Sequence, residues 1–344
     1  MNTMNDQTVF SSDILKLDAA VAVDRIVRAI RRLVLKDLHR KGAVLGLSGG
    51  IDSSVVAALS VRALGAERVL GLLMPECDSS WESLTLGRFI GDHLGIKTVV
   101  EDITPILAGA GCYQRRDEMI RKVIPHYTPD YKCKIFLPNL LHQESYRLFS
   151  VVVQSPDGQV SKARLSLDAY HGIVAATNFK QRIRKMMEYY HADRLNFAVM
   201  GTPNRLEYDQ GFFVKNGDGS ADVKPIAHLY KTQVYQLAEY LGIPEDIRSR
   251  PPTTDTYSLS QSQEEFYFSL PYNKMDLCLY GKNQNIPSVE VARAVGLTAE
   301  QVESVYRDIA SKRKATRYLH LRPLLIEPVR EICDESLISC SASH

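Results

Sequence analysis

Hydrophobic and polar positions recur along the chain with two different periods. Residues 13–40 carry apolar side chains at helical spacing, with charged residues mostly between them, which predicts an amphipathic helix. Short apolar runs then alternate with helical patterns, an order typical of a parallel sheet with helices on both faces. The predicted order is strand 43–47, helix 53–64, strand 68–75, helix 80–95 and strand 97–102.

The regular alternation is interrupted in the middle of the chain. Residues 146–154 and 159–167 predict the two strands of a hairpin, joined through an Asp-Gly turn. A helix at about 170–190 and a buried strand at 195–201 then resume the parallel pattern. We therefore interpret residues about 110–170 as an inserted hairpin or lid.

The rest of the chain is expected to be mostly helical. A polar loop at 202–225 precedes a helix at 230–241, and two or three further helices end near Arg317. We assign residues 1–320 to a single α/β domain with a doubly wound parallel sheet, and residues 321–344 to a C-terminal tail. In such a fold, ligands bind at the carboxyl ends of the strands.

Composition narrows the class of protein. A net charge of +2 over 344 residues excludes a strong global basic field, so we expect no nucleic acid partner. The six cysteines show no zinc-ligand spacing, and the N-terminal sequence lacks a signal-peptide pattern. No apolar run approaches the roughly 18 residues of a membrane span. We therefore expect a cytoplasmic protein with no membrane partner.

The most informative stretch is "VLGLSGGIDSSVVAAL", which begins at Val44. It places small and hydroxyl residues where a buried strand turns into a helix. Free backbone amides and the positive end of the helix dipole make such a turn a site for an anion. The candidate phosphate-binding residues are Gly46, Leu47, Ser48, Gly49, Gly50, Ile51, Asp52 and Ser53.

Asp52 indicates that a metal ion binds beside the phosphate. A carboxylate beside a phosphate is repulsive unless a cation lies between them, which implies Mg²⁺. The alternative is that Asp52 only caps the helix and that the glycines form a tight turn. The S-G-G-x-D-S pattern at 48–53 resembles the pyrophosphate-binding loop of the ATP pyrophosphatases. That resemblance implies cleavage of ATP between its α and β phosphates through an adenylate.

A second stretch narrows the resemblance. Residues 201–247, which begin "GTPNRLEYDQGFFVKNGDGSADVKP", closely resemble the corresponding segment of NAD synthetases. The stretches "TNFKQRIRKMMEYY" (177–190) and "PPTTD" (251–255) are similar to two further motifs of that family. The resemblance covers about residues 13–110 and 170–315. It implies ammonia-dependent amidation of deamido-NAD⁺, with ATP consumed and NAD⁺, AMP and pyrophosphate formed.

The resemblance also implies roles for individual residues. Asp52 and Glu207 would share Mg²⁺, and catalysis would come from positioning and electrostatics rather than from a nucleophilic side chain. Taken singly, Arg182 could instead belong to a solvated helix face with Lys180, Arg184 and Lys185. The catalytic candidates are Asp52, Glu207 and Lys215; ATP would contact residues 46–53, Thr202, Lys231 and Thr253; the acceptor would contact Arg182, Lys215, Asp222, Ser311 and Lys312.

Three features depart from the family pattern. Gln263 replaces an acidic residue in a segment that also lacks the family's E-L-G, Ser311 replaces a histidine, and residues 110–170 exceed the usual length. The alternative enzyme is therefore a paralogue that amidates another carboxylate, for example one carried by a partner protein. A third hypothesis is an ATP-binding or regulatory module that has lost catalytic activity. The insertion residues that would dock a partner are Tyr113, Arg115, Arg116, Arg121, Lys122, Lys132 and Lys134.

The nitrogen source and the assembly follow from the same resemblance. About 43 residues precede the strand of the phosphate loop, too few for a glutaminase domain. Free ammonia or a separate amidotransferase would therefore supply the nitrogen. The family is typically a homodimer, and the helices predicted at 13–40 and 170–190 are candidate interface elements.

Overall fold

The central sheet consists of four parallel strands. The computed structural model describes residues 10–136, 149–252, 256–259 and 261–329. Within these ranges the strand order is β3-β2-β1-β7. A parallel bridge between Met200 and Val223 extends the sheet beyond β7. The predicted parallel sheet is confirmed, with strands β1 (Ala43–Gly46), β2 (Val69–Leu73), β3 (Lys97–Val100) and β7 (Ala198–Val199).

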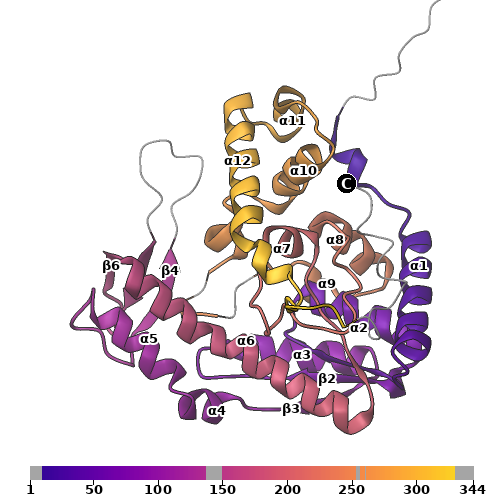
Figure 1. Ribbon diagram of the computed structural model, residues 1–344, viewed down its shortest axis with the longest axis horizontal. Coiled ribbons are helices and arrows are strands. Elements are labelled where there is room, and N and C mark those ends of the chain that lie inside the picture. The colour runs from indigo at the N-terminus through magenta and orange to yellow at the C-terminus, as the bar shows by residue number, and fades with distance from the viewer. Residues whose placement is uncertain (1–9, 137–148, 253–255, 260, 330–344) are drawn as a thin grey trace, which may run out of the picture.

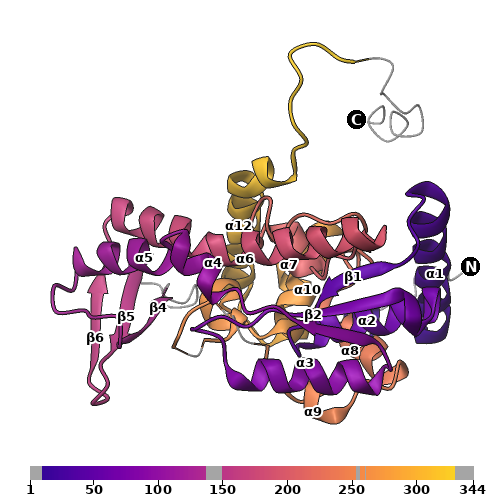
Figure 2. The same cartoon turned by 90° about the horizontal axis from the view of Figure 1, so that it is seen from below.

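Helices cover both faces of this sheet, as Figure 2 shows. Side chains alternate across a strand, so Ala43 and Leu45 of β1 pack on one face and Val44 on the other. The first face is buried by α1 (Ala19–Arg32), α2 (Ile51–Leu64), α3 (Trp81–His93) and α8 (Lys231–Tyr240). The second is covered by α6 (Leu167–Leu195). The arrangement is the predicted doubly wound α/β fold.

Two predicted elements have different bounds in the structure. The helix expected over 13–40 is divided into a 3-10 turn at Ser12–Leu15, α1, and a π-helical turn at Leu33–Asp37. The break before α1 occurs because the Asp18 carboxylate caps the backbone amide of Val21 and starts a new helix there. The strand expected at 195–201 is only β7, because α6 continues to its end at Leu195.

The middle of the chain forms a separate antiparallel sheet. Its strand order is β4-β5-β6, with bounds β4 Lys132–Phe136, β5 Ser150–Gln154 and β6 Val160–Arg164. The predicted hairpin is confirmed with shorter strands, whereas β4 was not predicted. Two helices, α4 (Thr104–Gly109) and α5 (Cys112–Arg121), lead into this sheet, and α5 packs along α6 (Figure 1).

The C-terminal part is helical, as predicted. It contributes a second hydrophobic core built from Leu279, Val291 and Val305, among others. Within the described residues, no helix is long and apolar enough to cross a membrane. The helices are α7 (Arg205–Gln210), α9 (Glu245–Arg248), a π-helical turn (Glu264–Phe268), α10 (Tyr272–Asn283), α11 (Ser288–Val295), α12 (Ala299–Thr316) and a 3-10 turn (Arg317–His320).

Candidate active site

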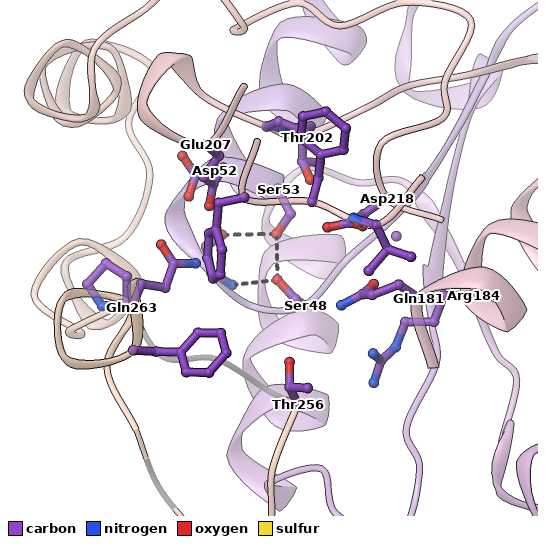
Figure 3. Close-up of a pocket in the computed structure, with 18 of the residues that line it drawn as sticks. Ser48, Asp52, Ser53, Gln181, Arg184, Thr202, Glu207, Asp218, Thr256 and Gln263 are labelled. Carbon is purple, nitrogen blue, oxygen red and sulfur yellow. Dashed lines mark hydrogen bonds between the residues drawn. The ribbon is translucent and has the colours of Figure 1, made fainter. Parts of the chain in front are cut away.

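A pocket of ≈ 770 Å³ lies at the carboxyl ends of β1 and β2, where α2 begins. Figure 3 shows its polar side chains, with Asp52 and Glu207 on one side and Gln181, Arg184 and Asp218 on the other. Ligand pockets of doubly wound folds lie at this edge of the sheet. The predicted residues that line it are Gly46, Leu47, Ser48, Gly50, Ile51, Asp52, Ser53, Thr202, Glu207, Ser311 and Lys312.

The glycine-rich turn leaves the first turn of α2 uncapped by any side chain. Gly50 is the N-cap residue, so the free amides of the first helical turn face the pocket region. The Ser48 and Ser53 hydroxyls lie 3.2 Å apart, and Ser53 donates to the Gly50 carbonyl at 3.0 Å. The arrangement suits an anion such as a phosphate.

Gly49 lies beneath this turn rather than in the pocket lining. Its φ of +72° belongs to the left-handed region that favours glycine. A Cβ atom there would lie 2.6 Å from the Cβ of Leu86 in α3. Gly49 is therefore required by the close approach of α3 to the loop.

Asp52 and Glu207 are brought together by Asn204. The Asn204 side-chain amide donates to Asp52 Oδ1 at 3.1 Å. Asn204 is also the N-cap of α7 in a reciprocal capping box, in which its own backbone N–H donates to Glu207 Oε2 at 3.1 Å. Gly50 is the N-cap of α2 and no side chain caps this helix, so the alternative that Asp52 only caps it is wrong. Asn204 was not predicted, although the N-x-x-E spacing at 204–207 is a capping-box signal.

Lys231 neutralises this pair of acids. Its ammonium group pairs with Asp52 Oδ2, and its side chain is fully buried. Burial and the nearby Asp52 raise the pKa of Glu207, partly offset by Lys231. Burial alone would lower the pKa of Lys231, but the two carboxylates raise it overall. Lys231 balances the charge of one acid, and the raised pKa means that Glu207 holds a proton more tightly than an ordinary carboxyl group. A divalent cation that displaced this proton would be balanced by the two carboxylates.

A further charged group, not selected from the sequence, lines the opposite side. Lys185 Nζ lies 2.6 Å from Glu188 Oε2, and both side chains are buried. Glu188 Oε1 would lie only 3.2 Å from a Cβ on Gly46, which keeps that position small. Asp218 accepts the Val214 N–H at 2.7 Å, and burial raises its pKa.

Three predicted acceptor residues are not in the pocket lining. Arg182 is exposed, and its Nε donates to the backbone carbonyl of Lys215 at 3.3 Å. The Lys215 ammonium donates to the Tyr318 carbonyl at 2.7 Å. The Asp222 carboxylate accepts the Val199 N–H at 2.8 Å. Thr253 lies outside the described residues.

The other acceptor candidates, Ser311 and Lys312, do line the pocket from α12. The Lys312 ammonium lies 2.7 Å from Asp308 Oδ2 and 2.7 Å from the Tyr267 carbonyl. Lys231 was predicted to contact phosphates, but in this structure its ammonium is paired with Asp52 beside the lining.

The basic run on α6 is only in part the solvated face that the sequence left open, because Arg182 is exposed whereas Lys180 and Lys185 are buried. Lys180 is fully buried and its ammonium lies 2.9 Å from Glu76 Oε1 and 2.6 Å from Asp78 Oδ2. Arg116 is also buried, 2.5 Å from the same Asp78 oxygen. The predicted docking role is therefore wrong for Arg116, which is buried. Tyr113 is half-buried, and its hydroxyl donates to Glu76.

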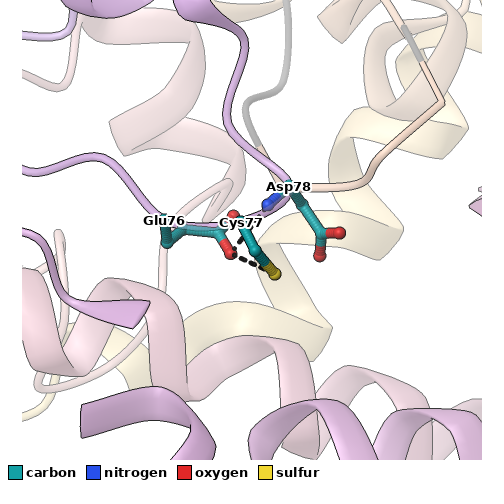
Figure 4. A group of neighbouring side chains, drawn as sticks. All are labelled: Glu76, Cys77 and Asp78. Carbon is teal, nitrogen blue, oxygen red and sulfur yellow. Dashed lines mark hydrogen bonds between the residues drawn. The ribbon is translucent and has the colours of Figure 1, made fainter. Parts of the chain in front are cut away.

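Figure 4 shows Glu76, Cys77 and Asp78 on the loop after β2. Their ligand atoms lie within 4.8 Å of one another. Lys180 and Arg116 already neutralise the two carboxylates, so this group is an internal ion-pair network rather than a metal centre.

The fold and the site together define a class of protein. A doubly wound sheet, an uncapped glycine loop at a helix start and paired carboxylates are the features of an ATP pyrophosphatase. A family model described as NAD synthase matches residues 22–122 and 150–318. The NH₃-dependent NAD⁺ synthetase of Rhizobium meliloti (strain 1021) is 62% identical over 334 residues, which is 96% of this chain and 100% of that protein. The chain belongs to the NAD synthase family.

Solved structures support the fold assignment. NMN synthetase from Francisella tularensis matches with a TM-score of 0.61 and 21% identity, over 91% of this chain and 100% of that chain. NH₃-dependent NAD synthetase from Campylobacter jejuni, in complex with the nitrate ion, matches with a TM-score of 0.60 and 23% identity over the same shares. At these identities the likeness concerns the fold alone.

Proposed function

We propose that the pocket binds ATP with its phosphates over residues 46–53, and that Asp52 and Glu207 hold Mg²⁺ there. The observation that supports this proposal is the shared contact of both carboxylates with Asn204 beside an uncapped helix start. Carboxylate oxygens are the donors that Mg²⁺ prefers. When bound, the ion would neutralise charge on the departing pyrophosphate.

Membership of the NAD synthase family makes the chain a ligase that forms a carbon–nitrogen bond. Its reaction is the ammonia-dependent amidation of deamido-NAD⁺, with ATP as co-substrate. An oxygen of the substrate carboxylate attacks the α phosphorus and pyrophosphate leaves, which gives an acyl-adenylate. Ammonia then attacks the acyl carbon, AMP leaves with the bridging oxygen, and one proton is released.

The residues of this chain would contribute positioning and charge. The free amides at the start of α2 would hold the pyrophosphate oxygens, and the Ser48 and Ser53 hydroxyls would add donors. Among the described residues, four cations line the pocket: Arg184, Lys185, Arg250 and Lys312. Of these, Arg184 and Lys312 are our candidates for contact with the anionic acceptor. When ATP and the acceptor are held together, the acceptor carboxylate is itself the nucleophile. The reaction therefore needs no nucleophilic side chain.

We propose that the functional form is a homodimer assembled over α6. Arg182, Met186 and Tyr190 are spaced four residues apart, so they share one face of this helix. All three are exposed, with Met186 at 50% and Tyr190 at 56%. The acceptor candidate Arg182 therefore lies on an apolar surface outside the pocket of its own chain, which suits a site completed by a second copy. Light scattering after gel filtration should give twice the mass of 38.6 kDa.

The reaction is tested by incubating the purified chain with ATP, MgCl₂, ammonium and deamido-NAD⁺. We expect NAD⁺, AMP and pyrophosphate in equal amounts, and no turnover when glutamine replaces ammonium. To test the alternative acceptor, the same assay is run with a panel of other carboxylates in place of deamido-NAD⁺. Formation of ADP and orthophosphate, or no stimulation by deamido-NAD⁺, would contradict the proposal.

A further inference from the structure

One side of the pocket is formed by residues 256–259 and 261–267, which we name the wall segment. Its Tyr257 and Phe266 rings also pack into the hydrophobic core of the insertion, with ring centroids 5.9 Å apart. The wall segment therefore has one side in the pocket and the other against the insertion. Its pocket-lining residues are Thr256, Tyr257, Gln263, Phe266 and Tyr267.

The wall segment runs along the edge of β4 that β5 does not occupy. The Leu259 N–H donates to the Cys133 carbonyl at 3.1 Å, and the Cys133 N–H donates to the Ser258 hydroxyl at 2.9 Å. The Gln261 side-chain amide donates to the Ile135 carbonyl at 2.9 Å. Strand β4 pairs with β5 through its other edge, so the wall segment takes the place of a further strand.

A buried cation fixes the start of the wall segment. The Lys180 ammonium donates to the Thr256 carbonyl at 2.8 Å, in addition to its contacts with Glu76 and Asp78. Arg116, from the helix that leads into the insertion, shares Asp78 with Lys180. The ion-pair network thus joins α5, α6, the loop after β2 and the wall segment. Charges this deeply buried hold their partners in place, because an unpaired member carries a large desolvation cost.

We propose that the inserted sheet is a scaffold that positions the wall segment for nucleotide binding, with Ser258, Gln261 and Lys180 as positioning residues. This inference rests on the proposed function for the identity of the nucleotide. The family model leaves residues 123–149 unmatched, which includes β4. The stretch at 260–272 is also where this sequence lacks the family's E-L-G. Strand β4, which the family model leaves unmatched, therefore supports the wall segment, whose own sequence differs from the family pattern.

The test uses the full chain and two variants that remove side-chain hydrogen bonds without changing any charge. They are Ser258→Ala alone and Ser258→Ala together with Gln261→Leu. Neither residue is among the pocket-lining side chains. Ser161→Ala, in β6 on the far side of the inserted sheet, is the matched control. Hydrogen exchange of peptides that contain the Leu259 amide reports on the wall segment without any substrate. Calorimetric titration with ATP and MgCl₂ reports on nucleotide binding.

If the inserted sheet is a scaffold, hydrogen exchange at the Leu259 amide should become about tenfold faster in the double variant, with a smaller change in Ser258→Ala. The affinity of the double variant for ATP should weaken by a similar factor. Exchange in β1 and α2, and all values for Ser161→Ala, should stay at wild-type levels. If wall-segment exchange or ATP affinity in the double variant equals that of wild type, the scaffold proposal is overturned. Failure of the wild type to make NAD⁺ would contradict the proposed function instead, and the exchange measurement would still test the scaffold.

Discussion

Asn204 donates a hydrogen bond to Asp52 over 3.1 Å, although 152 positions separate the two residues. The same side chain accepts the Glu207 N–H at 3.3 Å and so caps α7. The Asn204 side chain therefore holds the Asp52 carboxylate and the backbone of Glu207, while the Glu207 carboxylate accepts the Asn204 backbone N–H. Substitutions of Asn204 can therefore remove the contact with Asp52 and the cap of α7 separately.

Replacing Asn204 by Ser keeps a cap but removes the amide donor to Asp52, whereas Asn204→Ala removes both. We expect Asn204→Ser to lower kcat/KM and Mg²⁺ affinity by about 10–100-fold, the usual effect of losing a partner that orients a metal ligand. Asn204→Ala should lose about 1 kcal/mol of stability in addition, since the cap is gone. Steady-state kinetics over a range of Mg²⁺ concentrations and thermal unfolding measure the two effects. Wild-type Mg²⁺ dependence in both variants would refute the positioning role.

Lys231→Met leaves Asp52 and Glu207 without their buried cation. Removing one partner of such a group is strongly destabilising, so we expect a loss of about 3–5 kcal/mol in EDTA. Mg²⁺ should restore part of this loss in the variant, because a divalent cation can neutralise the same carboxylates. Unfolding in urea with EDTA or with MgCl₂ measures both values. Lys122→Met, which breaks an exposed pair with Asp168, is the control and should change neither curve.

The sequence was sufficient for the parts of the site that are built by local pattern. The glycine-rich turn between a buried strand and a helix is a short-range signal, and the structure places it at the pocket as predicted. The doubly wound sheet followed from the alternation of apolar runs and helical patterns. These features depend on neighbours in sequence, so one chain is enough to predict them.

Apart from the pairing of Asp52 with Glu207, which the family resemblance implied, features that depend on distant partners were not predicted. Lys180 looks like one charge of a solvated run, and only the fold brings Glu76 and Asp78 to it across 104 and 102 positions. Strand β4 has an alternating pattern, with Cys133 and Ile135 buried, but its partner β5 begins only at Ser150. Long-range pairing decides such elements, and local propensity does not report it.

Asp276 gives a pH dependence with a definite sign. It accepts the N–H groups of Lys231 and Thr232 at the start of α8, and burial raises its pKa to about 6. A carboxyl group that binds its proton more tightly when folded makes the folded state less stable as pH rises from its unfolded pKa to about 6. We expect this fall in wild type, of about 2–3 kcal/mol at most, and not in Asp276→Asn. Urea unfolding from pH 4 to pH 7 measures it; parallel curves for the two proteins would contradict the assignment.

Gly49→Ala tests the close approach of α3 to the phosphate loop. The added Cβ would meet the Leu86 Cβ at 2.6 Å in a backbone conformation with φ of +72°. Gly95 offers a matched control, because its φ is +65° and a Cβ there would have no neighbour within 4 Å. Gly95→Ala should therefore lose only the strain of a left-handed alanine, about 1–2 kcal/mol. Gly49→Ala should lose more than that and also weaken ATP binding, because relief of the clash displaces the loop or α3. Urea unfolding and ATP titration compare the two variants, and equal losses of stability with equal ATP affinity would show that the clash with Leu86 is relieved at no cost to the loop.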